Sequence, residues 1–266
     1  MAKNLLQQVM LKAEDKTKKT FLDAQQLIDK INSGYIVKRE SKFQKKNSFA
    51  PSTIAYSHGE CPRYWYLAFE GAVFEDNTDP YGGANMTSGT KSHERIQQAM
   101  ADAGILKDSE FKVTYNDPPI FGFGDVILDW GGEDLLGEIK TMPNEGFEYR
   151  KASGKPKVGH LVQLLIYMKI LNKTKAVLIY ENKNNHELLI IPVEISDYYI
   201  RWVNQTFDWM REVRKAWEEK TMPKKNYRSN SKICKTCPLR TTCDSAGEGL
   251  IKIKSLEPID EALSMV

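Results

Sequence analysis

The sequence predicts an α/β fold whose core has the order helix, three strands, helix, strand. The first observation is TSGTKSHERIQQAMADAG, a helical pattern that ends at Gly104, as helices commonly do. The second is a set of apolar-rich segments, EFKVTY, FGFGDVILDW and EDLLGEIKTM, separated by the turn residues NDPP and Gly131-Gly132. The third is VGHLVQLLIYMKIL, which is apolar on most sides and typical of a buried helix. We therefore expect a mixed sheet flanked by helices.

Further elements surround this core. AVLIYENK and HELLIIPVEI predict strands that flank a turn at Asn184-Asn185. The polar first fifty residues favour helix, and APSTIAYSHGECPRYWYLAFEG predicts a helix or helix pair that carries Cys61. An aromatic-rich helix at about 197–219 precedes a cysteine-rich tail. We expect one domain over 1–266, made of a helical region at 1–70, a core at 87–195, and a helix with tail at 196–266.

The composition is that of a folded protein. Hydrophobic residues are 41% and charged residues 27% of the chain, which argues against disorder and against a fibrous protein. No apolar run approaches the roughly 20 residues needed to cross a bilayer, and the first residues lack a secretory signal pattern. We expect an intracellular, cytoplasmic protein without a membrane partner. A phage-encoded protein that acts in the host cytoplasm would also meet this expectation.

The net charge of +3 is too small to identify an anionic partner, but basic residues gather locally. They lie at Lys38–Lys46, Arg150–Lys157 and Lys224–Arg228, the last two with Gly, Pro or Asn that favour loops. Taken alone, each stretch is more simply a solvated surface. A catalytic site beside them would make them evidence for nucleic acid.

The hairpin centred on Gly131-Gly132 brings two carboxylates together. Residues paired across it have numbers that sum to 263, as those of Asp125 and Glu138 do, so these side chains should lie about 4.5–5.5 Å apart at Cβ. Lys140 is two residues beyond Glu138 and shares its face. Val126, Leu128, Leu135 and Ile139 form the opposite, apolar face. Adjacent carboxylates favour a bound hard cation such as Mg²⁺ or Mn²⁺, and a lysine beside them can assist an attacking water.

Alternatives to this site remain open. A solvated hairpin face with alternating charges would have the same pattern. The register also places Asp129 opposite Asp134, an unfavourable pair that could mark a bulge or a distorted turn. A second E-x-K, at Glu181 and Lys183, lacks an upstream glycine-flanked aspartate and ranks below the first.

The motifs SGTKSH, GFGD, GEIK and QLLIY, in this order from Gly89 to Tyr167, resemble the RecB-like branch of the PD-(D/E)XK nucleases. The resemblance implies a restriction-endonuclease-like αβββαβ core and a metal bound by His93, Asp125 and Glu138, with Lys140 assisting the water. It also implies that two helical residues position DNA or the lysine, namely Gln163 and Tyr167. His160 shares their face and is kept as a DNA contact, whereas His58 and His186 receive no role.

All four cysteines fall in a pattern typical of metal binding: Cys61, then Cys234, Cys237 and Cys243 in C-x2-C-x5-C. The ligand count alone does not separate zinc from an iron–sulfur cluster. CPRYWYL and CKTCPLRTTC resemble the iron–sulfur nucleases that include CRISPR-associated exonucleases and their phage-encoded relatives. The resemblance implies one 4Fe-4S cluster that ties the N-terminal helices to the tail, with zinc as the alternative cofactor.

The sequence thus predicts a metal-dependent DNA exonuclease of DNA repair, recombination or phage replication, acting on single-stranded DNA or on free ends. The resemblance, and not the residues by themselves, implies that the nuclease is an exonuclease. A helicase or recombination partner is possible. A non-catalytic DNA-binding subunit on a nuclease scaffold is the second hypothesis. A zinc-stabilised interaction protein without a nucleic-acid role is the third.

Overall fold

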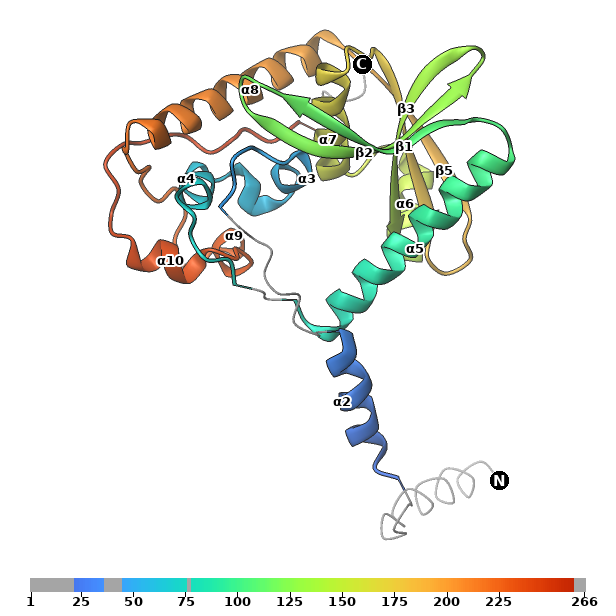
Figure 1. The fold of residues 1–266 in the computed structure, drawn as a ribbon, viewed down its shortest axis with the longest axis horizontal. Helices are drawn as coiled ribbons and strands as arrows, with labels where there is room; N and C mark the ends of the chain where they lie inside the picture. Colours follow the sequence, from blue (N-terminus) through green and yellow to red (C-terminus); the bar gives the residue numbers. More distant parts are fainter. Residues whose placement is uncertain (1–21, 36–44, 76–77, 261–266) are drawn as a thin grey trace, which may run out of the picture. The chain divides into compact units, whose positions relative to one another are not determined.

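The computed structural model describes residues 22–35, 45–75 and 78–260. They divide into two compact units. The smaller comprises residues 22–35, with helix α2 at Ala24–Tyr35, and residues 78–84. The other described residues form the larger unit (Figure 1). None of the described helices is both long and apolar enough to cross a membrane.

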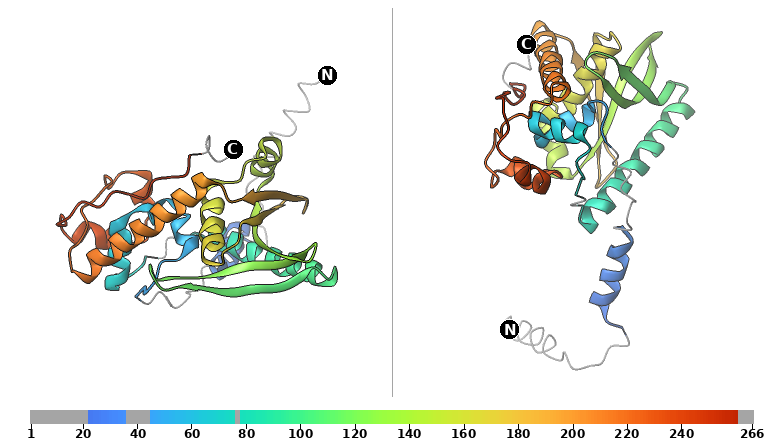
Figure 2. Two further views of the ribbon diagram at one scale, coloured as in Figure 1. Left: turned by 90° about the horizontal axis from the view of Figure 1, so that it is seen from above. Right: turned by 60° about the vertical axis from the view of Figure 1, so that its left-hand side comes forward.

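A five-stranded sheet in the order β1-β2-β3-β4-β5 is the centre of the larger unit. Its strands are β1 Leu106–Tyr115, β2 Ile120–Trp130, β3 Glu133–Met142, β4 Lys175–Asn182 and β5 Leu188–Glu194. Neighbours pair antiparallel except β3 and β4, which are parallel because α6 and α7 carry the chain across between them. β1 and β2 form a long twisted ribbon (Figure 2). The predicted mixed sheet flanked by helices is confirmed.

Different helices cover the two faces of the sheet. Helix α5, at Pro80–Asp102, packs Ile96 against Val126, Leu128 and Ile139, the apolar face expected from the alternation. Helix α7, at Val158–Ile170, buries most of its side chains on the opposite face. Glu138 and Lys140 alternate with Ile139 along β3 and therefore turn toward the α7 side.

The N-terminal helices pack with the C-terminal part of the chain. They are α3 Pro51–Ile54, a 3-10 turn at Ser57–Glu60, and α4 Pro62–Glu70. Helix α8, at Asp197–Glu218, lies against α4, and Phe49, Trp65, Phe69 and Trp209 form an aromatic cluster there. The tail follows with short helices α9 Lys232–Lys235 and α10 Arg240–Ser245. This packing brings Cys61 to the tail, although the two are far apart in sequence.

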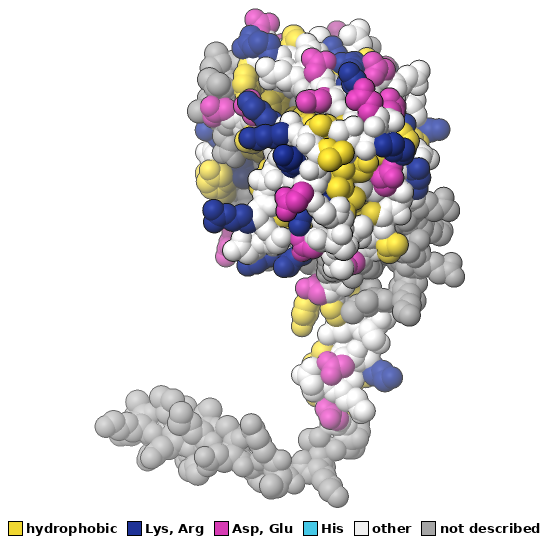
Figure 3. All heavy atoms as spheres, turned by 90° about the vertical axis from the view of Figure 1, so that its left-hand side faces the viewer, with side chains coloured by type: hydrophobic (Ala, Val, Ile, Leu, Met, Phe, Trp, Pro, Cys, Tyr) yellow, Lys and Arg dark blue, Asp and Glu magenta, His cyan; other side chains and the backbone are white. Residues whose placement is uncertain are grey.

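Two basic stretches were predicted as loops; Lys224–Arg228 is one, and Arg150–Lys157 is one only in part. Arg150–Lys157 is not wholly a loop, because α6, at Asn144–Ser153, includes its first half; the helix ends at Gly154, whose φ of 66° suits glycine. Most of Lys38–Lys46 lies outside the described residues. Its Lys46 packs over the rings of Trp65 and Phe74, and burial lowers the pKa of this lysine. On the face drawn in Figure 3, basic and acidic side chains are intermingled.

Candidate functional site

The β2–β3 hairpin has the register that the sequence predicts. Its pairs run from Val126 opposite Gly137 to Trp130 opposite Glu133, and each pair of numbers sums to 263. Asp129 and Asp134 are paired without a bulge. Lys107 of β1 relieves their repulsion, since its Nζ lies 3.4 Å from Asp129 Oδ2 and 2.8 Å from Asp134 Oδ1. The apparent weak point in the register is therefore compensated by a third strand.

Asp125, Glu138 and Lys140 come together just beyond the Val126–Gly137 pair, at the end of the hairpin away from its turn. The Asp125 carboxylate accepts the Ile139 backbone N–H at 2.7 Å through Oδ2, which fixes its orientation. Lys140 Nζ donates to Glu138 Oε1 and lies 3.9 Å from Asp125 Oδ2. Burial opposes the charge of Lys140, but the two carboxylates outweigh it and raise its pKa. The lysine is thus held as a cation between two acidic groups.

A group with metal-ligand geometry includes Asp125 and reaches helix α5. One ligand atom each from His93, Glu110 and Asp125 lies within 4.8 Å of the others. His93 Nδ1 is 3.8 Å from Asp125 Oδ1 and 3.9 Å from Glu110 Oε1. Gln97 of the same helix donates to both Glu110 Oε1 and the Asp125 carbonyl, at 2.9 and 3.1 Å. These bonds tie α5 to β1 and β2 beside the carboxylates.

The prediction from sequence missed Glu110. The signal was present in the first hairpin, where residue numbers sum to 235 from Phe111 opposite Gly124 to Tyr115 opposite Ile120. This register puts Glu110 opposite Asp125. Glu110 also has a φ of 49°, a left-handed backbone that is uncommon for a residue other than glycine.

Glu138 is fully buried and suits a cation. Its Oε2 has no hydrogen-bond partner among the described residues, although Oε1 accepts from Lys140. Burial, followed by the charge of Asp125, raises the pKa of Glu138 well above its ordinary value. A buried acceptor without a partner costs free energy of about 1–3 kcal/mol, which a hard cation would offset. The carboxylate oxygens therefore suit a hard divalent ion. Of the three predicted ligands, however, only His93 and Asp125 belong to the group with metal-ligand spacing, whose third member is Glu110 and not Glu138.

Helix α7 holds the adjoining part of β2. Tyr167 is buried, and its hydroxyl forms hydrogen bonds with the backbone of Phe123 and the side chain of Gln163. A Cβ at Gly122 would lie 2.5 Å from the Tyr167 hydroxyl oxygen, so β2 can approach the helix only with glycine there. The geometry gives Tyr167 a place beneath the strand that carries Asp125.

The basic segment after α6 lies within electrostatic reach of this site. His160 packs beside Tyr180, with 3.3 Å from Nδ1 to the tyrosine oxygen. Burial lowers the pKa of His160 to about 3, and the charges of Lys140, Lys157 and Arg150 add to the effect. The ring is therefore neutral at neutral pH. The charges of Lys140, Lys157 and Arg150 thus all act on the same ring.

The second E-x-K has a different environment. Glu181 alternates with Tyr180 on β4 and lies on the sheet face opposite to Lys140. It pairs with Arg95 and with His186, whose Nδ1 lies 2.9 Å from Glu181 Oε1. Glu181 is therefore neutralised by an arginine and, among the described residues, it lacks the second carboxylate that Glu138 has in Asp125.

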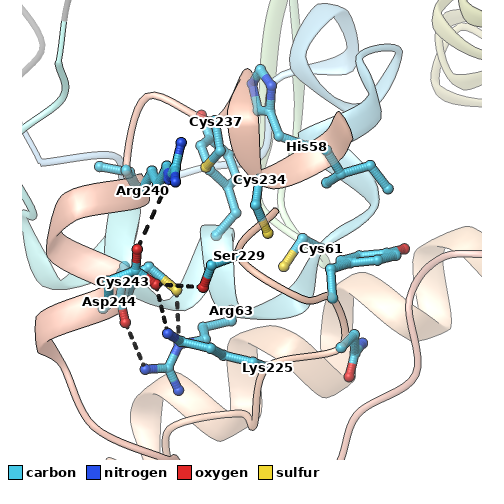
Figure 4. A pocket seen from close by; sticks show the side chains of 16 residues that line it. His58, Cys61, Arg63, Lys225, Ser229, Cys234, Cys237, Arg240, Cys243 and Asp244 are labelled. Atoms are coloured by element: carbon cyan, nitrogen blue, oxygen red, sulfur yellow. Dashed lines mark hydrogen bonds and ion pairs between the residues drawn. The ribbon is translucent and has the colours of Figure 1, made fainter. Parts of the chain in front are cut away.

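The four cysteines line one pocket between α4 and the tail. The sulfurs of Cys61 and Cys234 point toward each other in Figure 4. Burial raises the pKa of Cys61 to about 12 and that of Cys237 to about 11. Both are protonated thiols unless a metal replaces their protons. His58 also lines the pocket, and burial together with the charge of Lys46 lowers its pKa to about 4.

Arg63 is a second residue that sequence reasoning missed. It is fully buried, and its guanidinium donates from Nε to Cys243 Sγ at 3.1 Å and from the other nitrogens to the carbonyls of Pro223, Cys243 and Gly247 (Figure 4). Within the described residues, no carboxylate forms an ion pair with it. A buried cation without a counter-charge is costly. The surrounding thiol sulfurs, once deprotonated on a metal, would supply that charge.

Comparison with solved structures relates the fold to nucleases. The alkaline exonuclease LHK-Exo from Laribacter hongkongensis aligns with a TM-score of 0.51 and 11% identity over 66% of this chain and 92% of its own. Its complex with dAMP aligns with a TM-score of 0.50 and 13% identity over 65% and 91%. The chain thus shares the fold of this exonuclease. SSO0001 is also similar, with a TM-score of 0.47 and 16% identity over 82% and 96%. No protein-family profile and no curated sequence matches the chain.

Proposed function

We propose that this chain is a metal-dependent DNA nuclease that hydrolyses phosphodiester bonds as an exonuclease. The observation that carries the proposal is the position of Asp125 between His93 on one side and Lys140, which is bonded to Glu138, on the other, on a fold similar to that of an exonuclease. The same constellation gives carboxylate oxygens for a hard cation and a cationic group for the reacting phosphate. The similarity of the fold to that of an exonuclease supports cleavage that starts from a free DNA end.

In this proposal His93, Asp125 and Glu138 hold Mg²⁺ or Mn²⁺, and Glu110 is a further ligand or a hydrogen-bond partner of the bound water. The ion would polarise the phosphodiester and stabilise the developing negative charge. Asp125 and Glu138 orient Lys140, which is placed to donate to the attacking water or to the phosphate oxygens. Gln97 holds the Glu110 carboxylate, and the Ile139 N–H holds that of Asp125.

Glu110 and Glu138 can be distinguished by experiment. Glu138→Gln removes a buried ligand and should abolish cleavage. Glu110→Gln keeps the shape and should raise the Mn²⁺ concentration for half-maximal cleavage, with less effect at saturating Mn²⁺. Equal loss in both variants would make Glu110 a full ligand.

We further propose that the four cysteines hold a 4Fe-4S cluster with a structural role. In the described part of the chain, no three of the cysteine sulfurs lie within 4.8 Å of one another. Thiolates on one tetrahedral zinc ion lie about 3.8 Å apart, given Zn–S bonds of about 2.3 Å. The larger cluster suits the wider spacing, and its negative charge would compensate Arg63. Zinc remains the alternative cofactor.

The decisive experiment is incubation of the purified protein with end-labelled single- and double-stranded DNA, with and without Mn²⁺. Shortening from one labelled end only with Mn²⁺ supports an exonuclease. DNA binding without cleavage would favour the non-catalytic DNA-binding subunit. No feature of the described site favours that alternative. A visible absorption spectrum of the same sample, recorded after anaerobic purification, distinguishes the iron–sulfur cluster from zinc.

A further inference from the structure

Two phenylalanine rings stand exposed on β2, just before the candidate active site. Phe121 is 38% and Phe123 49% exposed. Their ring centroids lie 5.3 Å apart, with the planes at 86°. Exposed single apolar residues are common, but an exposed aromatic pair in contact is a feature of binding surfaces.

The two rings lie on the strand that carries Asp125. Phe121 and Phe123 precede Asp125 by four and two residues of β2, and the β1–β2 pairing has one register from Asp108 opposite Ile127 to Tyr115 opposite Ile120. Two residues of a strand advance by about 6.7 Å, so Phe123 lies about one such step from the metal-binding carboxylate and Phe121 two. A stacked strand of nucleic acid advances by about 3.4 Å per nucleotide. The rings are therefore within about two to four nucleotides of the reacting phosphate.

The intervening glycines force the rings outward. A Cβ at Gly122 would lie 2.5 Å from the Tyr167 hydroxyl oxygen, and one at Gly124 would lie 2.2 Å from the Phe111 ring. That face of β2 is filled by the protein itself. Phe121 and Phe123 consequently occupy the face that is left open, and the packing of β2 does not require aromatic side chains there.

A lysine lies over the pair. Lys112 Nζ is 5.4 Å from the centroid of Phe121, and Lys112 is the cross-strand partner of Phe123 on β1. Lys112 is itself exposed. Aromatic rings accept the faces of unpaired bases, while a neighbouring lysine attracts the backbone phosphates of the same strand. Rings, cation and catalytic carboxylate thus follow one another along two adjacent strands.

We infer that Phe121 and Phe123 form a stacking platform for unpaired bases of the strand whose phosphate reaches Asp125. This inference rests on the proposed nuclease function and specifies its substrate. The strand must be single-stranded across the platform, because a base that stacks on a side chain has left its own duplex stack. Double-stranded DNA would be a substrate only where its end is opened.

The test compares a normal oligonucleotide with one of equal length whose sugars carry no bases. Binding is measured by fluorescence anisotropy without added divalent ion, so that no cleavage occurs. The wild-type protein should bind the base-containing strand roughly 10-fold or more tightly than the abasic strand. F121A/F123A should lose most of this preference and keep its affinity for the abasic strand, whose phosphates still meet Lys112.

Two variants make the test specific. F121L/F123L keeps apolar bulk without aromatic faces and should behave like the alanine pair, with an unchanged melting temperature. Trp130→Ala removes another exposed ring, 66% exposed at the far end of the same strand, and should keep the wild-type preference.

A preference that survives in both double variants would overturn the platform, as would equal wild-type binding of the two oligonucleotides. Self-association of the wild type that disappears in F121L/F123L would assign the rings to a contact between copies and overturn it as well. A separate assay of Mn²⁺-dependent cleavage by the wild-type protein tests the proposed nuclease function. Cleavage without base preference refutes the platform alone, whereas binding with base preference and no cleavage refutes the nuclease alone.

Discussion

The two polar sites of the larger unit are assembled in different ways. The carboxylate site takes Asp125, Glu138 and Lys140 from one hairpin, so its geometry follows from strand register. The cysteine site joins Cys61 to a tail far along the chain, and its geometry depends on packing of α4 against α8 and the tail. In the first, charges are compensated between side chains of adjacent strands. In the second, a buried arginine has no carboxylate partner among the residues that the structure describes. A substitution at the carboxylate site should therefore abolish cleavage without unfolding the protein. A substitution at the cysteine site should instead destabilise the fold.

The largest effect is expected from Asp125→Asn. The amide oxygen still accepts the Ile139 N–H, so the fold is retained, but a charged metal ligand is lost. Cleavage with Mn²⁺ should fall by a factor on the order of 10³ or more. Asp134→Asn is the matched control, because Asp134 is an exposed aspartate of the same hairpin. This variant should cleave DNA at the wild-type rate. End-labelled DNA assays and melting curves measure both. Full activity of Asp125→Asn would remove the site from this hairpin.

Loss of one cysteine should affect stability first. Cys61→Ala removes a metal ligand, and the binding energy of the metal is part of the folding energy. Iron, sulfide and visible colour should disappear together, with a large fall in melting temperature. A Cys61/Cys237 double variant should be little worse, because the link between α4 and the tail is already broken. Stoichiometric zinc in a colourless, fully folded wild-type protein would overturn the cluster.

Arg63→Met tests whether the metal site supplies the counter-charge of the buried guanidinium. The metal-loaded protein should lose about 3–5 kcal/mol of unfolding free energy, since the negative site is left without its cation. The metal-free protein should lose less, because its thiols are protonated. Denaturant unfolding of both forms measures the difference, with the exposed Arg240→Met as control. Equal losses in the two forms would show that Arg63 acts only through its backbone hydrogen bonds.

A smaller effect is expected at Tyr167→Phe, which removes the hydroxyl beneath β2. Each of its two lost hydrogen bonds costs about 1 kcal/mol, and cleavage should fall no more than about 10-fold with an unchanged Mn²⁺ requirement. Tyr198→Phe is a useful comparison, because its hydroxyl accepts from the Asp260 N–H outside the candidate site. It should lose similar stability and no activity. A 10³-fold loss in Tyr167→Phe would instead give the hydroxyl a direct part in the reaction.

The smallest effect concerns His160 and pH. Its pKa is about 3 in the folded protein, below the ordinary value near 6.5, so protonation favours the unfolded chain. Stability associated with the neutral ring is complete above pH 6.5 and is lost as the pH falls from 6.5 toward 3. His160→Gln should therefore flatten the decline of melting temperature between pH 6.5 and 4. An unchanged acid limb would show that His160 does not contribute to it.

Much of the fold was predictable because its signals are local. Strand β3 has the predicted bounds, and α7 and α8 differ from theirs by one residue at the C-terminal end. Helix α6 was mistaken for a loop because Gly154 and Pro156 follow it closely and obscure its short run. For the site, one hairpin register found Asp125 and Glu138, but Glu110 required the second register as well. Arg63 had no local signal, because only the tertiary packing buries it.

We propose that Asp125 belongs to a metal centre independent of the cysteine site. The most direct test is a Mn²⁺ titration of wild type, Asp125→Asn and Cys61→Ala, followed by the electron paramagnetic resonance signal of free Mn²⁺. The wild type should bind Mn²⁺ tightly, Asp125→Asn should lose this binding, and the folded fraction of Cys61→Ala should retain it. Unchanged Mn²⁺ binding by Asp125→Asn would contradict the claim.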